Sequence, residues 1–262
     1  MRQISNFHTH SLYCDGKNTP EEMVQEAIRL HCPAIGFSGH SNTPFDPGYC
    51  MDAAREAAYR AEVLRLQKAY GGKIKIHLGI EQDYYSAPAD PGYSYVIGSV
   101  HYVKKNGEYL SIDDTPEGFQ QGVERLYGGD YDALCRDYFA LVEDVVRKTG
   151  CRIVGHFDLV TKFNEKYHFF EEDQPSYQEA ALQALHSLLD QGALLEINTG
   201  ALSRGWKSSP YPADFLLKEV GRLGGTMILS SDAHRAEDLL YGLPQAAALA
   251  ETYGISLAED PF

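Results

Sequence analysis

Short apolar runs rich in β-branched residues alternate with amphipathic helical stretches along the chain, and this alternation restricts the fold more than any other feature. Strands separated by helices pair in parallel. The apolar runs lie at 4–10, 34–40, 74–81, 95–101, 152–156, 193–198 and 226–231. We therefore expect an α/β fold with seven parallel strands, in which the active site gathers at the carboxyl ends of the strands.

The segments between these runs carry helix signals. Thr19 can cap a helix, Pro20 suits its first position, and Glu22 completes a capping box, so a helix is predicted to begin there. Further helices are expected near 52–69, 133–148, 175–190, 212–222 and 236–251. The less regular stretch 104–131 is expected to form an elaborated loop. No repeat or linker divides the chain, and 1–262 is expected to form a single domain.

Charge and cysteine usage exclude several classes of protein. The 37 acidic and 23 basic residues give a net charge of −14, which disfavours an extended nucleic-acid surface. No stretch approaches the roughly 18 apolar residues of a membrane span, and no secretory signal pattern is present. The five cysteines are scattered without a C-x-x-C pair, which argues against disulfides and zinc ribbons. We expect a cytoplasmic protein without membrane or nucleic-acid partners.

Six of the ten histidines fall at or just after the predicted strand ends. His8 and His10 are two residues apart on the first run, so their side chains point to the same side. The other residues with ligand chemistry at strand ends are His40, Glu81, His101, His156, Asp232 and His234. We expect these side chains to converge. The four remaining histidines are expected to be packing or surface residues: His31, His77, His168 and His186.

Such a cluster has the chemistry of a metal centre. Imidazole suits zinc, iron and manganese, whereas carboxylates suit harder ions and can bridge two of them. With Asp15 included there are nine candidate ligands, which fit two or three ions better than a single catalytic zinc with about three protein ligands. A multinuclear site can generate hydroxide near neutral pH and clamp the attacking and leaving oxygens. Three divalent ions outweigh three carboxylates in charge, which favours a phosphate ester over a neutral amide.

Two basic residues near strand ends are candidates for binding the phosphate. Arg204 lies in the loop after the sixth run and could form a bidentate contact, and Lys162 follows the fifth run. Motifs of other enzymes are missing: the sequence has no G-x-x-x-x-G-K-[ST], no G-x-G-x-x-G after a strand and no G-x-S-x-G. Cys14 lacks a phosphatase loop around it and is expected to be a packing residue. The sequence therefore predicts a metal-dependent hydrolase.

The candidate ligands lie in the segments HTHSLYCDG from residue 8, GH at 39–40, GIE at 79–81, GSVHY at 98–102, GHFD at 155–158 and SSDAH at 230–234. In this order they resemble the PHP (polymerase and histidinol phosphatase) family. The chain length and the CDGK and GSVHY segments are most similar to its monofunctional histidinol-phosphate phosphatase branch. The resemblance implies a distorted (β/α)₇ TIM-like barrel and three divalent ions (zinc, manganese or iron). It also implies hydrolysis of L-histidinol phosphate to L-histidinol and phosphate in histidine biosynthesis.

Carried over by motif position, the resemblance also implies a role for each ligand. The first metal would be held by His8, His10, Glu81 and Asp232. Glu81 would bridge to the second metal, which is completed by His101 and His156. The third would be held by Asp15, His40 and His234, although family members often have histidine in place of Asp15. In the implied mechanism a metal-bridging hydroxide attacks phosphorus in line. Asp232 orients it or takes its proton, and His234 or metal-bound water assists the leaving alkoxide.

Three alternatives remain at this point. A PHP phosphoesterase acting on nucleotides or short oligonucleotides is disfavoured by the net charge and the absence of an added nucleic-acid domain. An amidohydrolase-type enzyme also begins with H-x-H but usually bridges its metals with a lysine, where this chain has Glu81. The third is a metal-binding protein without turnover. The group that recognises the substrate's ammonium or imidazole is left open among Asp46, Asp113, Glu117 and Glu165.

Overall fold

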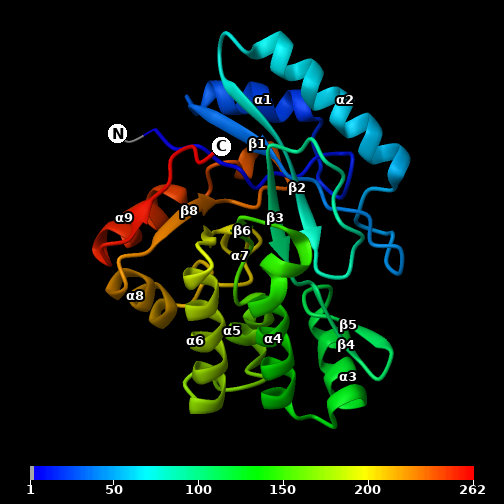
Figure 1. Cartoon of the computed structure of the whole chain (residues 1–262), viewed down its shortest axis with the longest axis vertical. Helices are drawn as coiled ribbons and strands as arrows, with labels where there is room; N and C mark the ends of the chain where they lie inside the picture. Colours follow the sequence, from blue (N-terminus) through cyan, green and yellow to red (C-terminus); the bar gives the residue numbers. More distant parts are fainter. Residues whose placement is uncertain (1–2) are drawn as a thin grey trace.

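A curled sheet of parallel strands forms the centre of the computed structural model, which describes residues 3–262 (Figure 1). Its strand order is β1-β2-β3-β6-β7-β8-β9, and every neighbouring pair is parallel. The strands are β1 Ala34–Phe37, β2 Lys75–Asp83, β3 Tyr95–Ser99, β6 Ile153–Val154, β7 Leu194–Asn198, β8 Thr226–Ser230 and β9 Ser256–Leu257. Because all run in one direction, their carboxyl ends share one edge of the sheet, and the predicted α/β fold is confirmed.

The first predicted strand, at 4–10, is not a regular strand. This segment makes only single bridges, from Asn6 to Ile35 of β1 and from Thr9 to Ala233 after β8. The segment 4–10 therefore lies between β1 and β8 and closes the sheet into a distorted barrel. The seventh regular strand is instead β9, which pairs with β8 and was not predicted. Its two residues are too few to give a periodic signal.

The predicted helices are present, with one correction. They are α1 Pro20–Arg29, α2 Ala53–Tyr70, α4 Tyr131–Thr149, α6 Pro175–Asp190, α8 Asp214–Arg222 and α9 Leu243–Thr252. The capping box of α1 is formed, with Glu22 N donating to Thr19 Oγ1 at 3.2 Å and Thr19 N donating to Glu22 Oε2 at 2.8 Å. The helix expected at 236–251 is broken, because Gly242 adopts a left-handed φ of 71°. Before Gly242 the chain forms a 3₁₀ turn, Ala236–Asp238, and α9 begins after it.

The stretch 104–131 is not the predicted loop. It contributes to a hairpin of β4 Tyr102–Lys105 and β5 Glu108–Ser111, followed by the helix α3 Pro116–Tyr127. Asn106 and Gly107 form the turn with φ values of 52° and 87°, the left-handed conformations that Asn-Gly hairpin turns require. Figure 1 places this hairpin and α3 together beside α4. The Asn-Gly pair was the signal in the sequence for this hairpin.

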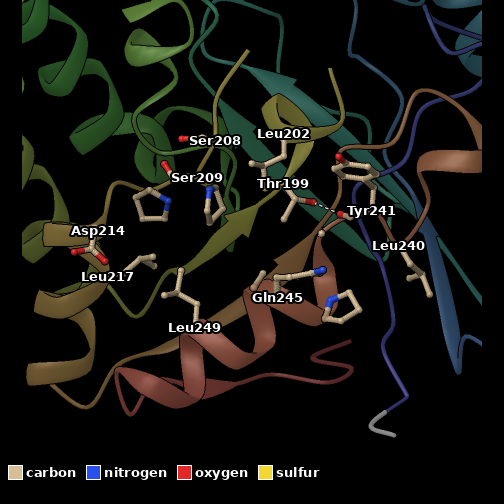
Figure 2. Close-up of a pocket in the computed structure, with 15 residues that line it drawn as sticks. Thr199, Leu202, Ser208, Ser209, Asp214, Leu217, Leu240, Tyr241, Gln245 and Leu249 are labelled. Carbon is tan, nitrogen blue, oxygen red and sulfur yellow. Dashed lines mark hydrogen bonds between the residues drawn. The ribbon is translucent and has the colours of Figure 1, made fainter. Parts of the chain in front are cut away.

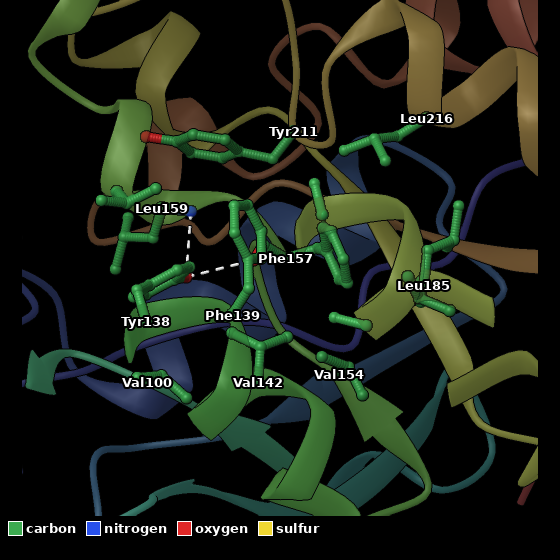
Figure 3. Packing of buried hydrophobic residues seen from close by; sticks show 14 of the residues in the cluster. Val100, Tyr138, Phe139, Val142, Val154, Phe157, Leu159, Leu185, Tyr211 and Leu216 are labelled. Carbon is green, nitrogen blue, oxygen red and sulfur yellow. Dashed lines mark hydrogen bonds between the residues drawn. The ribbon is translucent and has the colours of Figure 1, made fainter. Parts of the chain in front are cut away.

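Helices pack on the sheet from two sides and fix its strand ends. In the larger core cluster, α4 and α6 lie side by side against β6 and β7 (Figure 1). In a second cluster, α1 and α2 cover β1 and β2. Figure 3 shows Tyr138, Phe139 and Val142 of α4 facing Val154 and Phe157. The Tyr138 hydroxyl donates to Phe157 O at 3.1 Å and accepts from Leu159 N at 3.1 Å, which anchors the loop after β6.

Three shorter helical segments complete the fold: the 3₁₀ turn Leu159–Thr161, α5 Asn164–Tyr167 and α7 Gly200–Ser203. They follow β6 and β7 directly, and so lie at the edge where the carboxyl ends of the strands meet. Within residues 3–262, no helix has the length and apolar character needed to cross a membrane.

Candidate metal centre

The side chains predicted as metal ligands converge at the carboxyl edge of the sheet. Three overlapping groups are found among the described residues, and within each group one ligand atom per residue lies within 4.8 Å of the others. The groups are His10, Asp15, His40 and His234; His8, His10 and Asp232; and His40, Glu81 and His101. His156 joins them through Glu81, at 3.0 Å between Nε2 and Oε1. All nine residues thus lie in one cluster.

Glu81, at the carboxyl end of β2, is the centre of this cluster. Its Oε1 lies 3.0 Å from His156 Nε2 and 3.4 Å from His101 Nε2. Its Oε2 lies 2.9 Å from His40 Nδ1 and 3.2 Å from His8 Nε2. Burial opposes ionisation, but the imidazoles around it, His40 and His8 first, hold the pKa of Glu81 well below its usual range. An ionised carboxylate with each oxygen facing different histidines has the geometry of a bridging ligand.

Several polar atoms of the cluster are buried without a hydrogen-bond partner. They are His8 Nε2, His10 Nε2, Asp15 Oδ1, Glu81 Oε2 and His156 Nδ1. Such atoms are costly to bury unless something satisfies them. Burial, together with His234 and His40, also lowers the pKa of His10 to about 3, so this imidazole is neutral near pH 7, as a metal ligand must be. The donor set therefore fits divalent metal ions.

A further carboxylate behind the cluster orients two of its histidines. Glu196 on β7 is fully buried, and its Oε1 lies 2.7 Å from His8 Nδ1. The same carboxylate accepts from His156 N at 3.1 Å, Asn198 Nδ2 at 2.9 Å and Ser230 Oγ at 2.7 Å. With Nδ1 held in this way, Nε2 of His8 faces the centre of the cluster. The sequence places Glu196 near a strand end, but this role was not predicted.

Asp83 holds His101 in a comparable way and was also missed. Its Oδ2 lies 3.3 Å from His101 Nδ1 and accepts from His101 N at 3.2 Å. Asp83 is the last residue of β2, two positions after Glu81, so both carboxylates extend from the same face of that strand. One strand therefore supplies a central carboxylate and the group that orients its neighbour.

The two basic residues predicted to bind phosphate have different surroundings. Arg204 Nη2 donates to Asp232 Oδ2 at 2.8 Å, and the side chain remains 31% exposed at the cavity. A side chain at Gly200 would collide with this pair, since a Cβ there would lie 2.7 Å from both partners. Lys162 also lines the cavity, but its Nζ donates to Asp113 O at 2.6 Å and Oδ2 at 3.1 Å. Its charge is therefore already paired.

The cluster forms the floor of an open cavity of about 810 Å³. A second cavity, of about 790 Å³, lies between α7, α8 and α9 (Figure 2). Its walls are mostly apolar, with Leu202, Leu217 and Leu249 among them, and it contains none of the histidines. Thr199 Oγ1 donates to Tyr241 O across one side at 2.6 Å. Among residues 3–262, the side-chain groups that could hold a metal ion lie at the first cavity.

The four histidines and the cysteine that were predicted to have only packing or surface roles are not members of the metal cluster. His186 pairs with Glu219 at 2.6 Å, and His77 Nε2 lies 3.2 Å from Asp260. His31 and His168 are at helix ends with left-handed φ values. Cys14 is 3.5 Å from His10 Nδ1, but burial and Asp15 raise the pKa of its thiol to about 12. A protonated thiol is a poor nucleophile, in agreement with its predicted packing role.

Imidazoles and carboxylates clustered at the carboxyl ends of a parallel barrel define a metal-dependent hydrolase. The chain belongs to the PHP domain family, which matches residues 6–200.

Similar proteins agree with this assignment. The chain is 31% identical over 254 residues to a protein named "Probable histidinol-phosphatase" from Deinococcus radiodurans, covering 90% of this chain and 88% of that protein. It is 26% identical over 257 residues to the histidinol-phosphatase of Bacillus subtilis, covering 89% and 94%. A solved structure of histidinol phosphate phosphatase from Lactococcus lactis, complexed with zinc, L-histidinol and phosphate, matches with a TM-score of 0.75 at 23% identity, covering 97% and 95%. This last likeness shows the shared fold.

Proposed function

We propose that the chain is a histidinol-phosphate phosphatase that hydrolyses L-histidinol phosphate to L-histidinol and phosphate. The observation that carries the proposal is the cluster of six histidines and three carboxylates around Glu81, with Arg204 beside it. Its charge and donor set suit a phosphate ester. The choice of histidinol phosphate among phosphate esters rests on the relatives, which are named histidinol-phosphatases. The alignments cover 88% and 94% of those proteins.

We further propose three divalent ions, of zinc, manganese or iron, in overlapping sites. The first is assigned to His8, His10, Glu81 and Asp232, the second to Glu81, His101 and His156, and the third to Asp15, His40 and His234. The distances support shared use of ligands, since His10 also approaches the third group and His40 approaches Glu81. When bound, such ions activate water and neutralise the oxygens of the phosphate.

The protein side chains have separate tasks in this mechanism. Arg204 binds a phosphate oxygen from its position beside Asp232 at the cavity, and Lys162 adds a weaker positive contribution because Asp113 shares its charge. Burial opposes ionisation of Asp232, but Arg204 and His8 keep its pKa well below the usual range. Asp232 therefore stays ionised and orients the attacking water. Asp232 takes the proton that the water loses as the water oxygen bonds to phosphorus and the ester P–O bond breaks. His234 gives a proton to the leaving alkoxide without a phosphoenzyme, and both groups return to their starting states by proton exchange with solvent.

The same proposal covers organisation and location. We assign 1–262 to one domain, and the support comes from residues 3–262, where the core clusters flank one seven-stranded sheet. The location is cytoplasmic, supported by five cysteines that are all free, as expected in a reducing compartment.

The test is a substrate panel on protein loaded separately with zinc, manganese or iron. Phosphate release is measured from L-histidinol phosphate, nucleoside monophosphates and a phosphodiester, and we expect clear preference for the first. Activity on only the other two would contradict the substrate assignment. Glu81→Gln should abolish turnover and reduce bound metal, whereas the surface variant Glu219→Gln should change neither. Full activity of Glu81→Gln would refute the site.

A further inference from the structure

Basic residues of the metal cavity gather around His234. Arg204 Nη1 lies 3.1 Å from His234 Nδ1 while its Nη2 pairs with Asp232, the backbone N–H of Lys17 donates to His234 O at 2.7 Å, and Arg235, the next residue in the chain, pairs with Glu237. All three basic residues line the cavity. A phosphate group is therefore favoured on this side, next to the metal ligands that follow β8.

The part of the wall beside His40 and His101 is aromatic and acidic. The Tyr49 ring centroid lies 4.8 Å from that of His40 and 6.2 Å from that of His101. Tyr102, which is 5% exposed, packs 6.3 Å from Tyr49 between ring centroids. The Tyr102 hydroxyl donates to Asp46 Oδ2 at 2.8 Å and so fixes this carboxylate at the cavity wall.

Asp46 differs from the other cavity carboxylates outside the metal cluster. Asp113 is paired with Lys162, and Asp238 belongs to the turn that begins after Arg235, on the positive side. Asp114 is exposed and lacks a positioning contact of this kind. Among residues 3–262, no lysine or arginine makes an ion pair with Asp46. It is thus positioned by a hydrogen bond while its charge remains unpaired.

Two other acidic residues considered from the sequence are unsuited to this role. Glu165 Oε2 accepts from Ser208 N at 2.8 Å, and Glu117 lies in the first turn of α3, where it interacts with the helix N-terminus. Neither lines the cavity. The cavity therefore has basic residues near His234, and an unpaired carboxylate, Asp46, with two tyrosines near His40 and His101.

We propose that Asp46, Tyr49 and Tyr102 form a subsite for an organic ammonium group, which makes the enzyme selective for phosphomonoesters that carry an amine. The ammonium contacts the Asp46 carboxylate and the half-buried Tyr49 ring, buried Tyr102 holds Asp46 in place, and the phosphate occupies the side of Arg204. This inference rests on the proposed phosphatase function. It adds named residues that would favour histidinol phosphate over a phosphomonoester of similar size that lacks an amine.

The test compares Asp46→Asn with unmodified protein on L-histidinol phosphate and on 2-phenylethyl phosphate, an aromatic ester without an amine. We expect the ratio of the two kcat/KM values to fall about 10- to 100-fold, mainly through KM for histidinol phosphate, because one charge-assisted contact is lost. The affinity for L-histidinol, measured by calorimetry without turnover, should fall by a similar factor. Metal content should match that of unmodified protein.

Two further variants sharpen the test. Tyr102→Phe should lower the ratio in the same direction, because Asp46 loses the hydroxyl that positions it. Asp114→Asn, a matched loss of charge at the cavity mouth, should keep the ratio within about twofold. An unchanged ratio and unchanged histidinol affinity in both Asp46→Asn and Tyr102→Phe would overturn the subsite alone. Failure of the unmodified, metal-loaded protein to hydrolyse histidinol phosphate would instead overturn the proposed function.

Discussion

Glu196 connects the metal cluster to the sheet at the scale of single residues. It accepts hydrogen bonds from donors on three segments and contacts His8 Nδ1 at 2.7 Å, with no exposure to solvent. A neutral amide at this position could present its NH₂ group to His8 and favour the wrong ring tautomer. The carboxylate is therefore expected to be a positioning residue for metal binding.

We predict that Glu196→Gln weakens metal binding by about 10- to 100-fold, the range typical for the loss of a group that orients a ligand. The dissociation constant would be measured by competition with a chromogenic chelator. Glu219→Gln is the matched control, because it removes a carboxylate from another Glu–His pair, the surface pair with His186. Equal metal affinity in the two variants would exclude the positioning role.

Asp158, at the end of the GHFD segment, gives the stability a pH dependence. It is fully buried, Ala213 N donates to its Oδ2 at 2.9 Å, and its Oδ1 has no hydrogen-bond partner. Burial raises the pKa of Asp158 from 3.8 to about 6, although Lys207 partly offsets this. Between these values the folded state holds a proton that the unfolded chain has lost, so this group's contribution to stability falls as pH rises from 4 to 6.

We therefore predict that Asp158→Asn becomes more stable relative to unmodified protein as pH rises. The difference in unfolding free energy should grow by about 2–3 kcal/mol between pH 4 and pH 7, since one pKa unit corresponds to about 1.4 kcal/mol. Urea titrations of both proteins with chelator present would measure it. A difference that stays constant over this range would show that Asp158 has the same pKa in the folded and unfolded states.

Sequence patterns predicted which residues lie near the site, but not which atoms those residues contact. The ligand positions from His8 to His234 could be predicted because most end or follow a strand, and parallel strands bring their ends together. Glu196 and Asp83 could not be assigned, because their roles depend on which ring nitrogen they face. Asp46 could be named only as one of several acidic residues, since its distinction comes from a hydrogen bond to Tyr102.

At the scale of elements, Tyr95 joins three parts of the barrel. Its ring extends from β3 across β2, and its hydroxyl donates to Phe7 O at 2.5 Å and Phe37 O at 3.1 Å. Glycine at 79 leaves the space that the ring occupies, because a Cβ there would lie 2.2 Å from Tyr95 Cζ. Strand β2 also carries Glu81, two residues after Gly79. The packing of one tyrosine thus affects both barrel closure and the position of the central carboxylate.

Gly79→Ala is predicted to lower the free energy of unfolding by about 1–3 kcal/mol, the usual effect of overpacking a core. Gly72→Ala is the control, because a Cβ there meets nothing within 4 Å. Chemical denaturation would measure both. Replacing Tyr95 with leucine in the Gly79→Ala background should recover part of the loss relative to the two single changes. Equal stability of Gly79→Ala and Gly72→Ala would contradict this account of the packing.

Most long helices were predicted, but α3 was missed although Thr115 caps it and Pro116 begins it. Helices such as α1, α4 and α6 have their own caps or apolar faces, and these signals are local. The segment at 4–10 looks like a strand, but its neighbours are β1 and the chain after β8, so its pairing is decided by closure. The hairpin β4–β5 was missed because its strands, YVKK and EYLS, contain charged residues and form no apolar run, unlike β1 of the same length.

At the scale of the whole molecule, the metal cluster links distant parts of the chain. Its ligands extend from His8 to His234, and the segment carrying His8 is attached to its neighbouring strands by single bridges at Asn6 and Thr9. Bound ions would therefore hold the barrel closed at the place where its backbone pairing is sparsest. Metal binding is thereby coupled to the stability of the entire fold.

Removal of the metals should lower the melting temperature by about 5–10 °C. A ligand at 100 times its dissociation constant stabilises the folded state by about 2.7 kcal/mol, and each kcal/mol corresponds to about 2–4 °C for a chain of this size. Calorimetry with and without a chelator would measure the shift. Glu81→Gln removes the central ligand and should show a much smaller shift, because it holds less metal at the start. If chelation left the melting temperature of the unmodified, metal-loaded protein unchanged, the cluster would be a binding site that contributes nothing to barrel closure.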